Sequence, residues 1–454
     1  MLNRTRYYYL ERYTPTILLI SAFGPLLIPS MGIRLDQFLL YAYLPVAVGL
    51  FCVGRRSLLS KSVPLAILFI FIFITAWTLI VTVGGVPDHV GASYRTTMDE
   101  LAAFENYAHT IALITVLGVA IDLSNGPKSS SLLDKLGSIL IVLMCLNAVI
   151  AMSAIFTGSF PLAKYFVPGF QDVGDTPFEL VSEIGRFTGI FDTPSAAGAA
   201  YSVTLLLWCY LSRKSDKHLI RNYLAGGILI VGGTITISKI FLFGGIPLFF
   251  VYWMLPGRIS SRMTLKLLSV IVAAIIAIII FSELWIGLPN ISGFFVSDDN
   301  YDPVGRFFHF IKIRYGTADG ILFGGIFSYV WDVSPVVGLG FSYLAIADSA
   351  YLLYFMEGGI ISLLLYVIFV LFIIYLGVQE WRNGYEIGRF LAFLGGFLLI
   401  AGIGAPIITM PRTGMIFWTV LLLALAVRTE LHSLRAQAVQ KRRITIPNKF
   451  QESP

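Results

Sequence analysis

Five basic side chains stand beside or between apolar runs, and they are the residues of this sequence best suited to do chemistry. Arg186 precedes the run "TPSAAGAA", Lys239 lies in the turn of "TITISKIFLFGG" and Arg412 lies in "MPRTG". Arg306 and Arg314 lie in one long connection between apolar runs. Arginine contacts phosphate oxygens in pairs, and lysine attracts them as a point charge. Together these side chains predict a site for a highly charged anion such as a pyrophosphate.

The segment "EIGRFTGIFDTPSAAGAAYS" (183–202) indicates how such an anion would be held. Thr193 is a good N-cap and Pro194 a good first residue for a helix. Arg186 would then stand beside a positively polarised helix N-terminus, which favours anions. The small residues after Pro194 leave room for close packing. An alternative interpretation applies to Arg34 and Arg412, which would contact lipid headgroups instead.

Two acidic residues lie at the start of the apolar run near 350–377 and within it. Asp348, in "IADSAYLL", is either a helix N-cap or a carboxylate that takes a proton from a sugar hydroxyl. Glu357 lies inside the run, where an ionisable group is costly, so we expect it to support the site by pairing with a cation. Tyr351, between them, belongs to the predicted substrate-binding set.

The sequence predicts neither a metal nor a cofactor. "SDDNYDP" (297–303) has the alternating oxygen ligands of a calcium loop, but Pro303 replaces the required glycine and His309 stands where glutamate is needed. The five histidines do not cluster, which argues against zinc. Asp36, in "SMGIRLDQ", has no second carboxylate beside it in the sequence. The predicted chemistry is therefore metal-independent.

Membrane helices are the elements that must position these residues. Of 454 residues, 57% are hydrophobic and 13% charged, and the mean hydropathy is +0.82. This composition is typical of an integral membrane protein, in which a span needs about 20 apolar residues. We predict an all-α polytopic protein with a single membrane domain over 1–454. Its predicted spans, about twelve, lie near 14–30, 36–53, 63–84, 107–123, 137–157, 195–212, 222–238, 240–256, 267–287, 350–377, 390–408 and 413–427.

The basic residues predict the orientation. With twelve spans both termini lie on one side, and 23 of the 32 Lys and Arg residues fall there. The positive-inside rule places that side in the cytoplasm, including a basic tail over 428–454. The longer connections, near 85–106, 158–194 and 288–349, then face the periplasm, and 302–316 has the pattern of an amphipathic helix. The net charge of +6 follows largely from this topology and requires no nucleic acid.

Four stretches in this order resemble the bacterial O-antigen polymerase and O-antigen ligase superfamily, the Wzy-like proteins. They are "GRFTGIFDTPSAAGA", "TISKIFLFGG", "GRFFHF…SPVVGLGFSY" and "DSAYLLYFMEGGI". The resemblance implies an inverting glycosyltransferase of C-type membrane architecture in the bacterial inner membrane. Such an enzyme transfers a glycan from undecaprenyl pyrophosphate onto the end sugar of a second lipid-linked unit. A chain-length-regulating co-polymerase and the lipid bilayer are the further partners that it implies.

The resemblance also implies roles for individual residues. Arg186 would hold the donor pyrophosphate, while Asp348 would orient or deprotonate the acceptor hydroxyl. Lys239 stands where the family commonly has arginine, a change that would alter bidentate binding. Arg306 falls at the family's loop arginine, and Arg314 begins an Arg-x10-Gly spacing described for such polymerases.

Three functions stay open at this point: a polymerase of repeat units, a ligase-type transferase and a lipid-linked oligosaccharide flippase. Ligases of the superfamily carry histidine where this chain has Asp348, which favours a polymerase. A flippase would need charges along a central path, whereas the apolar runs here are almost free of charge. The sequence does not indicate which sugars are joined or through which linkage.

Overall fold

The computed structural model describes residues 13–28, 32–54, 57–84, 97–121, 129–157, 165–166, 186–214, 219–255, 341 and 349–445. Within these residues, seven helices are long and apolar enough to cross a membrane. Such helices satisfy their own backbone hydrogen bonds, as lipid requires. The chain is an α-helical protein embedded in a membrane.

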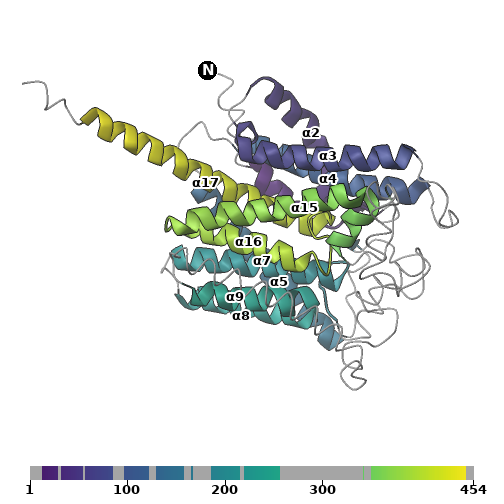
Figure 1. Ribbon diagram of the computed structural model, residues 1–454. Helices are drawn as coiled ribbons and strands as arrows, with labels where there is room; N and C mark the ends of the chain where they lie inside the picture. The colour runs from purple at the N-terminus through teal and green to yellow at the C-terminus, as the bar shows by residue number, and fades with distance from the viewer. Residues whose placement is uncertain are drawn as a thin grey trace, which may run out of the picture.

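The helices run side by side in one bundle (Figure 1). Those with a membrane-crossing core are α2 (Leu35–Cys52), α3 (Ser62–Gly84), α4 (Thr97–Ala120), α5 (Ser129–Thr157), α7 (Pro194–Lys214), α15 (Ala350–Arg382) and α17 (Pro411–Thr445). Three shorter helices are α8 (Leu219–Ile235), α9 (Ile246–Met254) and α16 (Glu386–Ala401). The smaller elements are a 3₁₀ turn, η2 (Leu58–Ser60), a π-helical turn, η5 (Ile240–Gly245), and two antiparallel strands, β1 (Leu26–Ile28) and β2 (Ile33–Arg34).

The prediction of one span over 14–30 is wrong. Residues 13–21 are helical, and the chain then turns at Gly24 and forms β1, in which Leu26 pairs with Arg34 of β2. The physical reason is the Gly-Pro pair at 24–25, which breaks a helix however apolar its neighbours are. This short hairpin carries Arg34 to the first turn of α2.

Several other predicted ends also differ from the structure, among them the start of α5 at Ser129 rather than at 137. α4 begins at Thr97, ten residues before the expected start at 107, and α16 ends at Ala401, because Gly402, Gly404 and Pro406 follow in a turn. The predicted tail over 428–454 continues α17 as helix up to Thr445, and in Figure 1 this part extends beyond the other helices. The predicted span at 267–287 lies outside the described residues.

α7 forms the centre of the bundle. Every residue from 196 to 210 is buried, and the helix contacts α5, α8, α16, α17 and η5. The adjacent pair α15 and α16 meets through glycines: a Cβ on Gly377 would overlap the backbone of Ala392, and one on Gly388 would overlap Trp381. Small residues let membrane helices approach this closely.

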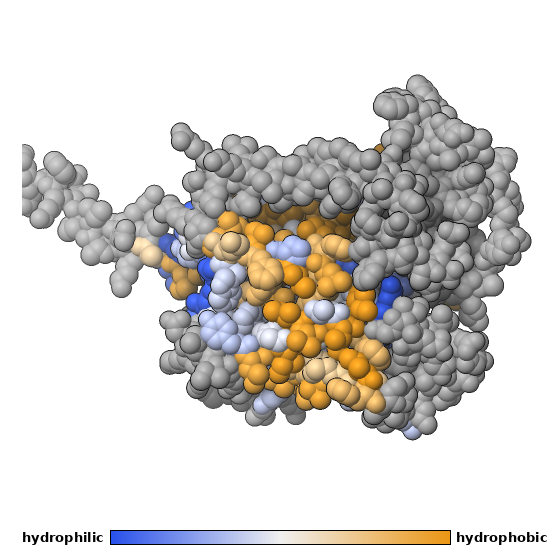
Figure 2. Space-filling view, turned by 90° about the horizontal axis from the view of Figure 1, so that it is seen from below, coloured by the Kyte–Doolittle hydropathy of each residue, from blue (hydrophilic) through white to orange (hydrophobic). Residues whose placement is uncertain are grey.

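Large apolar side chains also lie on the outside of the bundle. Figure 2 is seen from the side on which α8 and α9 lie in Figure 1, and it shows a broad hydrophobic area with few polar residues. Exposed side chains of these helices include Leu224, Val231, Phe250 and Met254. Contiguous apolar surface of this kind is uncommon on soluble monomers, and contact with lipid accounts for it.

The polar contacts sort the helix ends into two groups. α2, α4, α7, α15 and α17 all begin at one end of the bundle, which we call the Arg412 end. α15 and α17 approach each other again at the opposite end, which we call the Glu380 end. Most of the predicted site residues that the structure describes lie at the Arg412 end.

Candidate functional site

The segment 186–193, here called the Arg186 loop, is held by a buried asparagine of α5. Asn147 Nδ2 donates to the carbonyl of Thr188 at 3.3 Å, and its Oδ1 accepts from the amide of Ile190 at 2.9 Å. Between them, Gly189 has φ +68°, and a Cβ there would overlap the Asn147 amide. Only glycine adopts this conformation without cost so close to a side chain. The loop therefore has a defined shape.

The predicted start of α7 is confirmed. Pro194 is its first residue, and the Thr193 hydroxyl accepts from the Ala196 amide at 3.2 Å. The amide of Phe187 donates to Ile235 O at 3.2 Å, which ties the loop to the end of α8. Arg186 is half-buried, and its Nε has no hydrogen-bond partner in the described part of the chain.

The turn between α8 and η5 is strained. Ile237 has φ 46°, a left-handed conformation that β-branched residues adopt only under constraint. Lys239 follows and is exposed, and the chain then enters the π-helical turn η5. Strained residues and π-helical turns concentrate at functional sites, because they cost free energy that selection otherwise removes. The predicted tight turn at Lys239 is confirmed.

Ser238 fixes this turn against α7. Its side chain is buried, and within the described residues its Oγ has no hydrogen-bond partner. It lies against Gly198 so closely that a Cβ on this glycine would overlap the serine hydroxyl. The small residues of "TPSAAGAA" therefore let the Lys239 turn approach the first turns of α7.

Arg412 is buried and engaged with backbone. Its guanidinium donates to the carbonyls of Ile190, of Gly24 at 3.2 Å and of Phe166 at 2.8 Å. It thereby joins the Arg186 loop to two other segments. Arg412 is 2% exposed and Arg34 is 9% exposed, so neither side chain reaches lipid headgroups.

The turn 402–410 brings the remaining parts of this end together. Gly402 O accepts from the amide of Ala350 at 2.8 Å and from the hydroxyl of Ser349 at 3.0 Å. A Cβ on Gly404 would contact the side chain of Ile240, the residue after Lys239. The same turn leads into α17 and Arg412. The Arg186 loop, the Lys239 turn, Arg412 and the start of α15 therefore adjoin.

α15 is broken directly after Glu357. Gly358 and Gly359 have non-helical backbone angles, with φ 65° and ψ −162° at Gly359. Trp77 Nε1 donates to Gly358 O at 2.9 Å, so the break is held from α3. Glu357 is buried and accepts a hydrogen bond from the Tyr107 hydroxyl of α4. Breaks in membrane helices free backbone polar groups and are common where such helices bind ligands.

Three of the predicted site residues, Asp348, Arg306 and Arg314, lie outside the described residues. Tyr351, predicted to bind substrate, uses its hydroxyl to donate to Leu399 O at 2.6 Å. This contact joins the first turn of α15 to the end of α16.

The sequence did not indicate a polar group formed by the first turns of α2 and by α4. We call it the α2–α4 cluster; its residues are Arg34, Asp36, Gln37, Tyr41, Glu105 and His109. Glu105 Oε1 accepts from Gln37 Nε2 at 3.1 Å and from the Tyr41 hydroxyl at 3.0 Å. Asp36 has no second carboxylate beside it in the sequence, but the fold brings Glu105 of α4 within electrostatic range of it.

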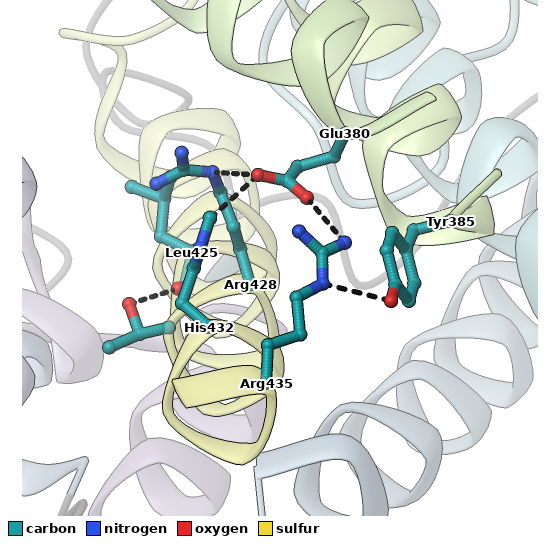
Figure 3. Close-up of polar contacts among 7 residues, drawn as sticks. Glu380, Tyr385, Leu425, Arg428, His432 and Arg435 are labelled. Atoms are coloured by element: carbon teal, nitrogen blue, oxygen red, sulfur yellow. Dashed lines mark hydrogen bonds and ion pairs between the residues drawn. The ribbon is translucent and has the colours of Figure 1, made fainter. Parts of the chain in front are cut away.

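The Glu380 end carries a different polar group. Figure 3 shows the Glu380 carboxylate facing two arginine side chains and a histidine of α17. It pairs with Arg428 at 3.3 Å, His432 at 2.6 Å and Arg435 at 3.2 Å, and Arg435 also donates to the Tyr385 hydroxyl at 2.8 Å. The buried carboxylate is fully paired, so this group fastens α15 to α17.

Comparison with known proteins does not identify the chain. No protein-family model matches it, and no curated protein matches it. Within the residues that the structure describes, no three His, Cys, Asp or Glu side chains are grouped to hold a metal ion. The function is therefore inferred from the side chains at the Arg412 end.

Proposed function

We propose that the protein is an inverting, metal-independent polymerase of lipid-linked glycans. It joins undecaprenyl-pyrophosphate-linked oligosaccharide repeat units into O-antigen or another surface polysaccharide. The observation that carries the proposal is the pair of fixed segments at the Arg412 end, the Arg186 loop held by Asn147 and the strained turn at Lys239. Two cations on such rigid supports suit an anion that must be bound in one geometry.

The chemistry follows from these residues. The acceptor hydroxyl oxygen attacks the anomeric carbon of the donor glycan, and the bond from that carbon to the pyrophosphate oxygen breaks. Asp348 takes the hydroxyl proton, and the pyrophosphate leaves with the bonding electron pair. Arg186 and Lys239 stabilise the charge that develops on the leaving group. Pyrophosphate is a good leaving group, so the reaction needs no cofactor.

The other predicted residues act around this centre. Arg306 and Arg314 add positive charge from the connection 288–349, and Arg412 keeps the Arg186 loop in place through the Ile190 carbonyl. Tyr351 orients the start of α15, directly after Asp348. Glu357 supports the break in α15 rather than the chemistry.

The same proposal includes an orientation. The Arg412 end faces the periplasm of the bacterial inner membrane, where lipid-linked repeat units are presented, and both termini lie in the cytoplasm. The support is the distribution of basic residues, since Arg213, Lys214 and the cations around Glu380 all lie at the opposite end. Both termini on one side require an even number of spans.

Deletion of the gene, followed by size analysis of lipid-linked and surface glycan, tests the function. We expect the ladder of polymer to disappear and single repeat units to remain at the surface. Arg186→Ala and Lys239→Ala should fail to restore the ladder. Lys214→Ala is the matched control, because Lys214 forms an exposed ion pair with Asp134 at the Glu380 end, and it should restore the ladder fully.

Other outcomes of this experiment would replace the proposal. Full-length polymer left on the undecaprenyl carrier would mean that the protein is a ligase. Repeat units trapped on the cytoplasmic face would mean that it is a flippase.

A further inference from the structure

The α2–α4 cluster has unused hydrogen-bonding capacity in a buried place. Asp36 and His109 are each 1% exposed. Among the described residues, Asp36 Oδ2 and the ring nitrogens of His109 have no hydrogen bond of good geometry, although the Pro411 backbone lies close to the His109 ring. The Nε atoms of Arg34 and Arg412 have no hydrogen-bond partner either. Buried polar atoms without partners are rare because they are costly, so such a group at one place indicates a bound polar molecule.

The charges around this place exclude most ligands. Arg34 and Arg412 both act electrostatically on Asp36, and Arg34 acts on Glu105. A phosphate would face two carboxylates, and a metal ion would face two guanidinium groups. Basic and acidic side chains stand side by side here, so neither an anion nor a cation meets a site of one sign, which favours a neutral ligand.

The unused atoms also differ in kind. The Asp36 oxygen only accepts, the two arginine nitrogens only donate, and a neutral histidine ring does both. A sugar hydroxyl donates one hydrogen bond and accepts two, so sugar hydroxyls suit both the donors and the acceptors of this cluster. Tyr41 and His109 lie with their rings 6.2 Å apart, edge to face, and add an aromatic wall.

The position of the cluster fits a glycan substrate. Arg412 links the α2–α4 cluster to the Arg186 loop, because it lies in electrostatic range of Asp36 and also donates to Ile190 O. α4 itself packs against both α2 and α17. A sugar at the cluster would thus lie beside the site proposed for the pyrophosphate.

We infer that the α2–α4 cluster binds a neutral sugar of the glycan substrate, with Asp36 and His109 contacting its hydroxyl groups. The inference rests on the proposed function for the identity of that glycan. The sugar belongs to the donor or to the acceptor unit, and kinetics distinguish the two sources.

The test measures binding of a free oligosaccharide, released by mild acid from the lipid-linked repeat units of the host. The probe carries neither lipid nor pyrophosphate. Its affinity is measured by calorimetry for the full-length protein in nanodiscs, with inorganic pyrophosphate as a second probe. The variants are Asp36→Asn, which keeps the shape, and His109→Phe, which keeps a ring and removes both nitrogens. Asp134→Asn, at the exposed ion pair of the Glu380 end, is the matched control.

We expect each cluster variant to lose about tenfold in oligosaccharide affinity, the effect of one lost hydrogen bond to the sugar. The control should bind as the wild type does, and pyrophosphate affinity should not fall. Equal oligosaccharide affinity in all proteins would overturn the inference. An equal loss for both probes would also overturn it, because it would indicate general disruption. If Asp36→Asn does not fold, His109→Phe alone carries the test.

Elongation kinetics separate this site from the proposed function. Asp36→Asn should raise KM for free oligosaccharide as acceptor if the sugar is the acceptor's, or for the lipid-linked donor if it is the donor's. If Asp36→Asn weakens oligosaccharide binding but the wild-type protein elongates no glycan, the sugar site is supported and the polymerase function is refuted. If the protein elongates glycans but its KM values do not change in Asp36→Asn and His109→Phe, the polymerase function is supported and the sugar site is refuted.

Discussion

Asn147 of α5 holds the Arg186 loop, and its replacement by alanine tests how the site is built. The side chain makes hydrogen bonds to Thr188 O at 3.3 Å, to the Ile190 amide at 2.9 Å and to the Tyr201 hydroxyl at 3.0 Å. Asn147→Ala removes all of them and leaves a buried backbone amide without its acceptor. Each such group costs about 1–3 kcal/mol, so the loop should lose about 3 kcal/mol in stability.

A loss of that size is large for a loop. Every 1.4 kcal/mol changes an equilibrium by about tenfold, so the ratio of closed to open loop should fall by roughly 100-fold. Misplacement of a catalytic group by about 1 Å can cost 10²-fold in rate. We therefore expect Asn147→Ala to reduce polymer formation by about 10- to 100-fold while Arg186 itself is still present.

The assay uses the purified protein in nanodiscs and lipid-linked repeat units extracted from a deletion strain. Polymer formation gives the rate, and thermal unfolding followed by tryptophan fluorescence shows that the variant is folded. Ser138→Ala is the control on the same helix, because Ser138 is exposed and bonds only to the Asp134 carbonyl of its own helix.

The double variant of Asn147 and Arg186 decides the interpretation. If Asn147 acts by positioning Arg186, adding Asn147→Ala to Arg186→Ala should cause little further loss of rate. Losses that multiply would mean that the two residues act separately. A folded Asn147→Ala protein with the wild-type rate would refute the idea that this loop positions the site.

Three further substitutions test the packing at the two ends. The new methyl group of Gly198→Ala would overlap the Ser238 hydroxyl, so this variant should displace the Lys239 turn and lower the polymerisation rate at least tenfold. Its control is Gly227→Ala, in open space on α8, which should be neutral or stabilise the protein by about 0.5–1 kcal/mol. Gly359→Ala should cost about 1–3 kcal/mol, because φ 65° with ψ −162° is a conformation essentially restricted to glycine, and it should lower both the unfolding temperature and the rate. Glu380→Gln leaves Arg428 and Arg435 without a charged partner; because both keep some access to water, it should cost about 1–3 kcal/mol in thermal unfolding, with the rate per folded molecule unchanged.

Hydropathy predicts where the membrane helices lie better than where they end. Membrane helices must be apolar over about 20 consecutive residues, a property that can be recognised from neighbouring residues alone. A helix continues past its apolar part wherever its backbone can still hydrogen-bond, so α4 begins ten residues early at Thr97 and α17 runs on to Thr445. Conversely, the apolar run 14–30 does not stay helical, since the Gly-Pro pair at 24–25 interrupts it.

The same distinction applies to the site. The Thr193 cap and the Lys239 turn depend on neighbouring residues, and both were predictable from turn and cap chemistry. Asn147 and Glu105 act on residues 41 to 68 positions away, so no local pattern reveals their partners. A single polar residue within "LMCLNAVIA" was the available signal, because a lone asparagine among apolar residues needs a partner.

The basic residues at the Arg412 end differ in what they can do, and their chemistry explains the difference. Arg412 donates to carbonyls from three separate segments, and the wide planar fork of a guanidinium suits such separated acceptors better than a compact ammonium group does. It is therefore a positioning residue. Lys239 is exposed on a strained turn, where its ammonium group acts as a point charge that attracts phosphate from any direction. Lysine at a position where arginine is expected is thus compatible with binding an anion that approaches from the membrane surface, provided that Arg186 supplies the directional contacts.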